Sequence, residues 1–308
     1  MSDRAVSPVA ERFDLEGYLR VQAEHADRAL EAAVREAQAL LPEALHAAIR
    51  HGVLSEGKRL RLVLCVTAYR ACGGESPDIP ELAASLELIH AYSLMHDDLP
   101  CMDDAELRRG HPTTHRVHGV EATARAGATL IPLAVLQTWR GALALGCDPG
   151  TGRRIVSELC RAAGAGGMVG GQAVDLRAEG ARLGAAELDR LHALKTGALL
   201  TAALRIGGVA AGASAPVIEA LDCYGEAIGL AYQIADDLLD ATASAEELGK
   251  NPSDAALDKT TYVAVHGLED AAARAHAEVA RARAALAGAG IDDPALHALA
   301  EYVVERRR

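Results

Sequence analysis

The chain is poor in aromatic residues, with one Phe, one Trp and seven Tyr among 308 residues. β-Strands favour aromatic and β-branched side chains, and proteins that bind single-stranded nucleic acids stack the bases on aromatic rings. This scarcity argues against an all-β fold and against single-strand nucleic-acid binding. Positive charge is also scarce, because 31 Lys and Arg stand against 43 Asp and Glu and leave a net charge of −12. Such an acidic chain is a poor partner for nucleic-acid phosphates or anionic lipid.

Cysteine pairs and long apolar runs are missing as well. The six cysteines form no Cys-x-x-Cys pair, which is typical of a reducing compartment, and the charged N-terminal segment lacks the apolar stretch of a signal peptide. The most apolar segment, residues 197–218, is interrupted by Arg205 and several glycines, so we expect no membrane-spanning segment. The sequence therefore predicts a cytoplasmic protein.

The residues that are abundant favour helices. Hydrophobic residues make up 50 % of the chain, and alanine, the strongest helix former, supplies roughly a fifth of it. Apolar residues recur at three- and four-residue steps in segment 82–95. Gly and Pro clusters divide the chain into segments of helical length; they lie at 72–77, 146–150, 164–171 and 249–252. We predict one all-α domain over residues 1–308, a bundle of about 10–13 helices.

Two clusters of aspartates lie far apart in the sequence, each at the end of an apolar helical segment. The first contains Asp97, Asp98 and Asp103, and the second contains Asp236, Asp237 and Asp240. Pro100 is expected to end the first helix, so that a turn brings Asp103 back towards Asp97. In the second cluster, Asp236 and Asp240 are four residues apart and project from one helix face together with Gln233.

Carboxylates in this arrangement predict a divalent metal that binds phosphate. Oxygen ligands suit hard cations, and Mg²⁺ commonly takes one or two carboxylates plus substrate phosphates. Phosphate cannot lie beside bare carboxylates, because two like charges about 4 Å apart repel by roughly 4 kcal/mol at an effective dielectric near 20. Basic residues able to bind phosphate are clustered near these motifs: Lys58, Arg59, Arg61, Arg108, Arg109, Lys195, Lys250 and Lys259.

These motifs, in this order, resemble those of the trans-prenyl diphosphate synthases, above all the bacterial farnesyl diphosphate synthases. The resemblance extends from Gly52 to the C-terminus and rests on residues 88–100, 107–115, 171–175, 195–197, 232–240 and 259–262. It implies an isoprenoid synthase fold, with helices around a deep central cavity, and a homodimer. It also implies a reaction in which an allylic diphosphate ionises, isopentenyl diphosphate adds to the cation, and a proton is lost.

The resemblance further implies roles for individual residues. Mg²⁺, three ions with substrate bound, would be held by Asp97, Asp98, Asp103, Asp236, Asp237 and Asp240. The allylic diphosphate would be bound by Arg108, Gln172, Asp175, Lys195, Thr196, Gln233, Lys250 and Lys259. Isopentenyl diphosphate would be bound by Lys58, Arg61, His90 and Arg109. Asp97, Asp103, Lys195 and Asp236 would be catalytic, and Thr196 and Gln233 would present oxygen dipoles to the developing cation.

The chain departs from the family pattern at several positions. Glu56 stands in place of a Gly and would bring negative charge near the isopentenyl diphosphate site. Leu62 stands in place of a Pro, and Tyr232 in place of a Phe. Residues 127–130 read Gly-Ala-Thr-Leu where Gly-Asp-Ala-Leu is usual, and the 250–259 loop is one residue short. None of these changes removes a predicted metal or diphosphate ligand.

Product length is the finest expectation drawn from the resemblance. Tyr92 and Ser93 lie five and four residues before Asp97, on the helix just below the metal. In the family, bulk at this level stops chain growth, so Tyr92 predicts a C15 product, farnesyl diphosphate. A geranylgeranyl diphosphate synthase is the alternative within the family, since those enzymes tend to carry a smaller residue there.

Other functions remain open at this stage. A class I terpene cyclase shares the first motif but usually has an Asn/Asp-Ser/Thr-Glu triad as its second site, and a non-catalytic partner subunit would not need two intact motifs. A di-iron helical protein is a remote alternative outside the family. Glu43 with His46 and Glu87 with His90 have the Glu-x-x-His spacing found in such sites. Two further inward-facing glutamates would be needed for iron, and the sequence offers no clear pair.

Overall fold

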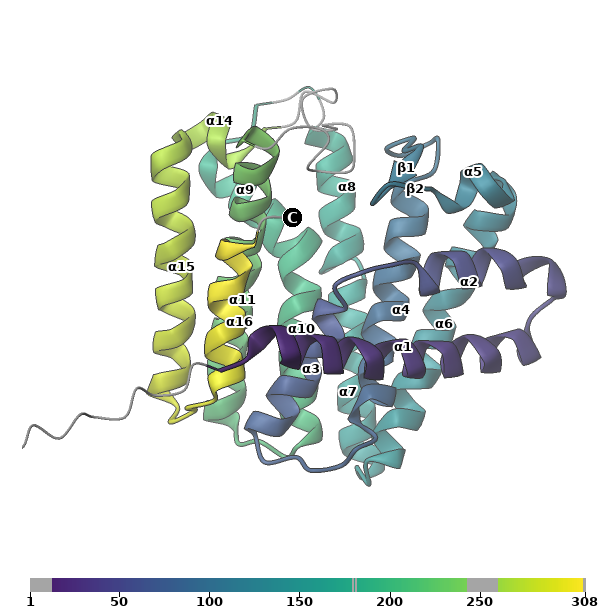
Figure 1. The fold of residues 1–308 in the computed structure, drawn as a ribbon, viewed down its shortest axis with the longest axis horizontal. Coiled ribbons are helices and arrows are strands. Elements are labelled where there is room, and N and C mark those ends of the chain that lie inside the picture. Colours follow the sequence, from purple (N-terminus) through teal and green to yellow (C-terminus); the bar gives the residue numbers. More distant parts are fainter. Residues whose placement is uncertain (1–12, 179, 181, 243–259, 307–308) are drawn as a thin grey trace, which may run out of the picture.

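A computed structural model describes residues 13–178, 180, 182–242 and 260–306 (Figure 1). Helices account for nearly all of the regular structure in these ranges, which confirms the predicted all-α class. The α-helices are α1 (Leu15–Leu40), α2 (His46–Leu54), α3 (Leu60–Ala71), α4 (Ile79–Asp97), α5 (Thr114–His118), α6 (Val120–Ala144), α7 (Pro149–Ala163), α8 (Met168–Ala178), α9 (Ala185–His192), α10 (Ala198–Ala210), α11 (Ala215–Thr242), α14 (Tyr262–His266), α15 (Leu268–Gly288) and α16 (Pro294–Glu305).

Short elements complete the described part. A 3₁₀ turn, η1 (Glu43–Leu45), precedes α2, and a π-helical segment, η2 (Ala193–Gly197), joins α9 to α10. A two-residue hairpin pairs β1 (Leu107–Arg108) with β2 (His111–Pro112). The described ranges contain fourteen α-helices, more than the expected 10–13, because α5 and α14 are only five residues long.

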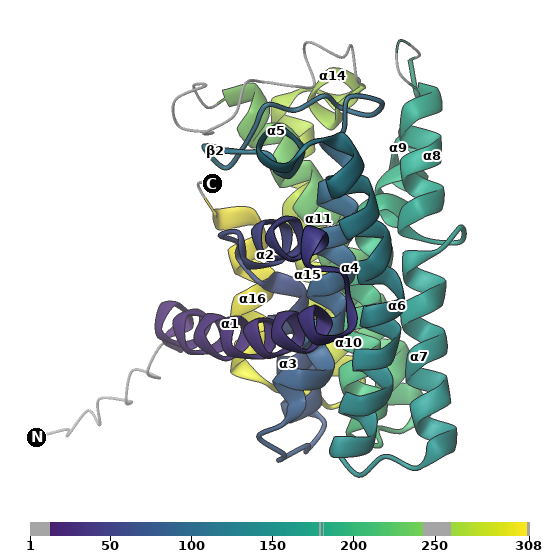
Figure 2. The ribbon, with the colours of Figure 1, turned by 90° about the vertical axis from the view of Figure 1, so that its right-hand side faces the viewer.

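The long helices place both aspartate motifs at one end of the bundle. In Figure 1, α4 and α11 run upwards, and α1 and α2 cross in front of the bundle. Asp97 is the last residue of α4, and Asp236, Asp237 and Asp240 lie in the last two turns of α11. The β1–β2 hairpin, α5, α9 and α14 gather at the same end (Figures 1 and 2).

Buried apolar side chains form two clusters. The larger one draws on α1 to α4, α6, α7, α10, α11, α15 and α16, so helices from the beginning and the end of the chain share one core. Alanine contributes much of it, and its small side chain lets the helices approach closely. A smaller cluster lies beneath the second aspartate motif and consists of Leu188, Ile234, Tyr262, Ala271 and Ala275.

Two glycines are required by close helix contacts. A Cβ on Gly207 of α10 would lie 2.2 Å from the carbonyl oxygen of Cys65 in α3. A Cβ on Gly171 would lie 2.3 Å from the backbone nitrogen of Lys195. Residues 164–171 were expected to be a break between helices, but α8 already begins at Met168. The later glycines therefore serve close packing against η2 rather than a turn.

One helical run, by length and composition alone, could cross a membrane. Residues Ala185–Ala210 are long and apolar enough by length and composition, although the sequence pattern had suggested no such segment. In the fold, 56 % of the most apolar 18-residue stretch of this run is buried inside the protein. Core helices of bundles meet the same length and composition criteria, and Leu199, Leu200 and Leu204 of this run belong to the larger core cluster.

Candidate active site

The first aspartate motif folds into the turn that Pro100 predicted. The backbone N–H of Asp103 donates to the carbonyl oxygen of Asp97 at 2.9 Å, and the N–H of Asp104 donates to that of Leu99 at 3.1 Å. Asp104 takes a left-handed conformation with φ 46°, which helps to reverse the chain. Asp97 and Asp103 are therefore brought together at the end of α4.

The neighbouring carboxylates of Asp97 and Asp98 have different environments. Asp98 is buried and accepts from Arg108, whose Nη2 lies 2.7 Å and whose Nε lies 3.0 Å from its oxygens. For Asp97, burial raises the pKa to about 6, although the charge of Lys195 acts in the opposite direction. Asp103 raises the Asp97 pKa further. A desolvated carboxylate beside another carboxylate is a site at which a cation would be stabilised.

The second aspartate motif also distributes its carboxylates among distinct partners. Asp237 is buried, and its Oδ2 accepts from the backbone N–H of Tyr262 at 2.6 Å. Asp236 is more exposed and forms an ion pair with Arg306 at 2.6 Å. Asp240 lies partly buried in the last turns of α11. All three lie on α11, where Asp236 and Asp240 are four residues apart.

Lys195 is linked to an acid of each motif, electrostatically to Asp97 and through a shared cleft to Asp237. It belongs to the π-helical segment η2, a type of irregularity that is frequent at functional sites. Its Nζ pairs with Asp175 of α8 at 2.5 Å, and its charge acts on Asp97. Lys195 and Asp175 also line a cleft together with Gln233 and Asp237. The cleft thus brings together predicted residues from three separate motifs, 171–175, 195–197 and 232–240.

Gln172 and Thr196 lie beside these groups. Thr196 follows Lys195 within η2 and is partly buried. The side-chain amide of Gln172 on α8 is buried, and neither its nitrogen nor its oxygen has a hydrogen-bond partner among the described residues. An amide without a protein partner is available to a ligand.

A cluster of cations lies on the other side of the first motif. His90 has a pKa well below its ordinary value, first because it is buried and then because Arg61, Arg109 and Arg108 surround it with positive charge. Burial likewise lowers the pKa of Arg61, whose Nε has no hydrogen-bond partner in the described structure. Arg109 is exposed and donates to the backbone oxygen of Glu56. Such a cluster suits a polyanion.

Leu62 and Lys58 flank this cationic cluster. Leu62, where the family usually has Pro, uses its backbone N–H to donate to the buried carboxylate of Glu87 at 3.2 Å. Proline has no backbone N–H and could not make this bond. The replacement of the usual Pro by Leu62 therefore gives the buried Glu87 carboxylate a donor in the first turn of α3. Lys58 is exposed in the segment that leads into α3.

Tyr92 and Ser93 lie on α4 one turn before Asp97. The Tyr92 ring packs edge-on against His96, with centroids 5.0 Å apart, and contacts the larger core cluster. The charge of Asp97 helps to raise the Tyr92 pKa, after burial. Ser93 donates to the carbonyl oxygen of His90 at 2.9 Å. These contacts place Tyr92 close to the first motif.

Two predicted ligands, Lys250 and Lys259, lie outside the described residues, as does the shortened 250–259 loop. In return, the structure identifies residues that the sequence analysis missed. Arg306 contacts Asp236 and also lies over the ring of Tyr232, with its guanidinium carbon 3.6 Å from the ring centroid. The only hint in the sequence was its place in a basic C-terminal tripeptide.

The donor set fits Mg²⁺ better than iron. Within the described residues, no three His, Cys, Asp or Glu side chains converge closely enough to enclose a metal by themselves. Mg²⁺ does not require such a cage, because it retains waters and takes phosphate oxygens. The acids of both motifs offer oxygen alone. Of the di-iron candidates, Glu87 is engaged by Leu62, and His46 lies 3.0 Å from the carbonyl oxygen of Leu41.

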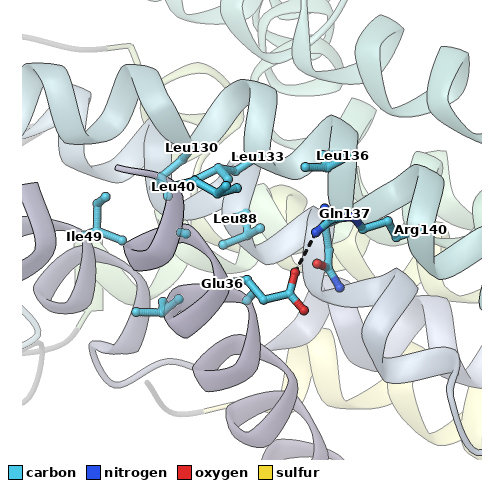
Figure 3. A pocket seen from close by; sticks show the side chains of 12 residues that line it. Glu36, Leu40, Ile49, Leu88, Leu130, Leu133, Leu136, Gln137 and Arg140 are labelled. Atoms are coloured by element: carbon cyan, nitrogen blue, oxygen red, sulfur yellow. Dashed lines mark hydrogen bonds and ion pairs between the residues drawn. The ribbon is translucent and has the colours of Figure 1, made fainter. Parts of the chain in front are cut away.

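A second hollow lies between α1, α2, α4 and α6 (Figure 3). Its wall is apolar, with Leu130, Leu133 and Leu136 of α6 on one side, and Glu36 pairs with Arg140 at its edge at 2.7 Å. It contains none of the predicted site residues. The cleft lined by Asp175, Lys195, Gln233 and Asp237 is therefore the candidate active site.

Residues 42–288 match the family model of the polyprenyl synthetases. The chain is 41 % identical to farnesyl diphosphate synthase of Escherichia coli over 270 residues, which cover 84 % of this chain and 88 % of that protein. It is 39 % identical over 300 residues to the large subunit 1 of a heterodimeric geranylgeranyl pyrophosphate synthase from Arabidopsis thaliana, covering 96 % of this chain and 80 % of the relative.

A solved structure shows the same fold. The geranyltransferase of Helicobacter pylori, complexed with magnesium and isoprenyl diphosphate, superposes with a TM-score of 0.78 at 27 % sequence identity. The superposition covers 98 % of this chain and 98 % of that one. The described helices thus follow the architecture of an enzyme that binds magnesium and a prenyl diphosphate.

Proposed function

The chain belongs to the polyprenyl synthetase family, and on that premise we propose that it is a Mg²⁺-dependent prenyltransferase. It condenses isopentenyl diphosphate with an allylic diphosphate. The observation that carries the proposal is the position of Lys195, which lines one cleft with Asp237 and acts electrostatically on Asp97. In this proposal the two acidic motifs, which are 139 residues apart from Asp97 to Asp236, would bind cations in one shared region.

The predicted site residues divide into three sets in this proposal, one for each ligand. Mg²⁺ would be held by Asp97, Asp98, Asp103, Asp236, Asp237 and Asp240. The allylic diphosphate would contact Arg108, Gln172, Asp175, Lys195, Thr196 and Gln233, together with Lys250 and Lys259. Isopentenyl diphosphate would contact Lys58, Arg61, His90 and Arg109. Support comes from the unpartnered Gln172 amide and from the cations gathered around His90.

The residues of the chain would act mainly through electrostatics. Bound Mg²⁺ would supply positive charge that stabilises the leaving diphosphate. Lys195 and Arg108 add fixed positive charge at the same place, while Thr196 and Gln233 turn oxygen dipoles towards the developing carbocation. No side chain needs to act as the base, since the released diphosphate can accept the proton.

The test of this function is turnover with defined substrates. The purified protein is incubated with isopentenyl diphosphate and the C5, C10 or C15 allylic diphosphate, with Mg²⁺ or with a chelator. We expect Mg²⁺-dependent formation of a longer prenyl diphosphate. Absence of turnover with every pair would refute the proposal. Consumption of farnesyl diphosphate alone, with release of a hydrocarbon, would favour the terpene cyclase instead.

We propose farnesyl diphosphate as the main product, with geranylgeranyl diphosphate as the alternative. The aromatic ring of Tyr92, braced by His96 beside the first motif, is the support for a C15 limit. The two relatives compared above carry both names, farnesyl and geranylgeranyl synthase. Chromatography of the extracted products distinguishes C15 from C20.

We propose that the chain works as a single domain that forms a homodimer in the cytoplasm. Helices α6 and α8 expose apolar side chains along one flank: Ile131, Leu143, Val169 and Val174 are 38–43 % exposed. All six cysteines are free, as expected in a reducing compartment. Analytical ultracentrifugation tests the dimer, and Ile131→Glu is expected to shift it to monomer. Fractionation of the cells tests the location.

A further inference from the structure

The small buried cluster beneath the second motif includes the residue that binds Asp237 through its backbone. The Tyr262 side chain is 0 % exposed, and its N–H donates to Oδ2 of Asp237 at 2.6 Å. Ile234, three residues before Asp237 on α11, belongs to the same cluster as Tyr262. Tyr262 is thus joined to α11 twice, by its backbone and through its ring, so its position is coupled to that of the Asp237 carboxylate.

The Tyr262 ring is held by groups from two other helices, α9 and α15, and by His266 of its own helix, α14. Its hydroxyl donates to Asp189 of α9, and Asp189 pairs with Arg274 of α15 at 2.5 Å. The Arg274 guanidinium lies 5.4 Å from the ring centroid. The rings of His192 and His266 stack against Tyr262 with centroid distances of 5.4 and 5.8 Å. Asp189 therefore receives two donors and connects α9, α14 and α15.

We propose that Asp189 and Tyr262 are positioning residues that hold the Asp237 carboxylate in the orientation needed to bind Mg²⁺. This inference rests on the proposed function. A hydrogen bond to one carboxylate oxygen fixes the direction of the other, and groups that support a metal ligand in this way commonly affect metal affinity. Neither residue contacts substrate in this assignment. They act through the backbone of Tyr262.

The ion pair between Asp189 and Arg274 is expected to contribute little to the stability of the fold. The side chains of Asp189 and Arg274 are 33 % and 30 % exposed, and ion pairs of this exposure stabilise a fold little. A Phe at position 262 would pack the same ring without the hydroxyl, so packing alone does not require a Tyr there. Instead, the Tyr262 hydroxyl contacts the Asp189 carboxylate while the Tyr262 backbone N–H contacts the Asp237 carboxylate. This pair of contacts points to a role in the site.

The experiment compares two fully buried tyrosines that each lose one hydroxyl bond. Tyr262→Phe removes the bond to Asp189 but keeps the ring and the N–H to Asp237. Tyr224→Phe is the matched control, because Tyr224 is also 0 % exposed, lies on α11, and donates its hydroxyl to the carbonyl oxygen of Leu296 at 2.7 Å. Isothermal titration calorimetry measures binding of Mg²⁺ with inorganic diphosphate, and thermal unfolding is followed in chelator.

We expect Tyr262→Phe to weaken Mg²⁺–diphosphate binding roughly three- to tenfold, below the full effect of losing a ligand's direct partner. Tyr224→Phe should bind within about twofold of wild type while losing a similar amount of thermal stability in chelator. Asp189→Asn, which keeps an acceptor but loses the charge, should weaken binding less than Tyr262→Phe.

Two results would overturn the inference: Mg²⁺–diphosphate binding by Tyr262→Phe indistinguishable from wild type, or equal weakening in both tyrosine variants. The second result would assign the effect to lost stability. Failure of the proposed function is recognised separately, since the wild-type protein would then show neither turnover of the prenyl substrates nor binding of Mg²⁺ with diphosphate.

Discussion

Replacing Asp97 with Asn should make the metal-free protein more stable while removing a proposed Mg²⁺ ligand. In the folded protein the Asp97 pKa is raised from its ordinary 3.8 to about 6, mainly by burial, even with Lys195 nearby. The folded chain therefore holds a proton more tightly than the unfolded chain does. Stability is lost as the pH rises from about 4 to about 6 and the buried carboxylate becomes charged.

The size of the effect follows from the shift. About two pKa units at about 1.4 kcal/mol each give up to about 3 kcal/mol of destabilisation above pH 6. Asn has nearly the same shape but no charge to desolvate. We therefore expect Asp97→Asn to raise the free energy of unfolding by up to about 3 kcal/mol at pH 8, and by much less at pH 4, where Asp97 is protonated in wild type as well.

Asp98→Asn is the matched control in the neighbouring position. Asp98 is buried like Asp97, but it is paired with Arg108 through Nε and Nη2. Removing its charge weakens charge-assisted hydrogen bonds, so this variant should lose about 1–3 kcal/mol at pH 8. The same substitution at adjacent residues is thus expected to change stability in opposite directions.

Urea denaturation in chelator at pH 4, 6 and 8 measures both changes, and repeating it with Mg²⁺ and inorganic diphosphate measures ligand stabilisation. Wild type should gain stability from the ligands, and Asp97→Asn should gain much less. The reasoning fails if Asp97→Asn is less stable than wild type at pH 8, or if its advantage is the same at pH 4 and pH 8.

Three further changes test other contacts. Gly207→Ala should destabilise the fold by about 1–3 kcal/mol in chemical denaturation, because its Cβ would meet the Cys65 carbonyl oxygen at 2.2 Å; a neutral effect would show that α3 and α10 can separate. Arg306→Ala should strengthen Mg²⁺ binding in calorimetry by up to about fivefold, since the ion pair between the buried Arg306 and the partly exposed Asp236 competes with the metal and is worth about 1 kcal/mol; weaker Mg²⁺ binding would show that Arg306 does not compete with the metal for Asp236. Tyr92→Ala should lengthen the product on chromatography, and an unchanged chain length would refute its role in stopping growth.

Local features of the candidate site were predictable from the sequence. Pro100 predicted the turn that brings Asp103 to Asp97, and the four-residue spacing of Asp236 and Asp240 predicted their common helix. Both depend on residues close in sequence, where helix geometry and proline stereochemistry suffice. Individual cations were also recognised, because Lys195 stands out in a chain with few lysines.

Contacts between distant residues were not predictable in the same way. The glycines of residues 164–171 predict a break between helices, because glycine often ends a helix. In the structure Gly171 lies inside α8, where the absence of a side chain lets the Lys195 backbone approach closely. The pairing of Arg306 with Asp236 joins residues 70 apart. Such contacts depend on how closely whole helices pack, and no local pattern reports that distance.

The sequence by itself determined the all-α class, the acidic character and the two aspartate motifs that predict a divalent cation, since helix periodicity and like-charge repulsion are local properties. The tertiary structure decided how each carboxylate differs from its neighbour. Asp97 is left desolvated beside Asp103, Asp98 is neutralised by Arg108, and Asp237 is held by Tyr262. Burial and the approach of partners from other helices set the charge state and orientation of each acid, and these exist only after the helices have packed.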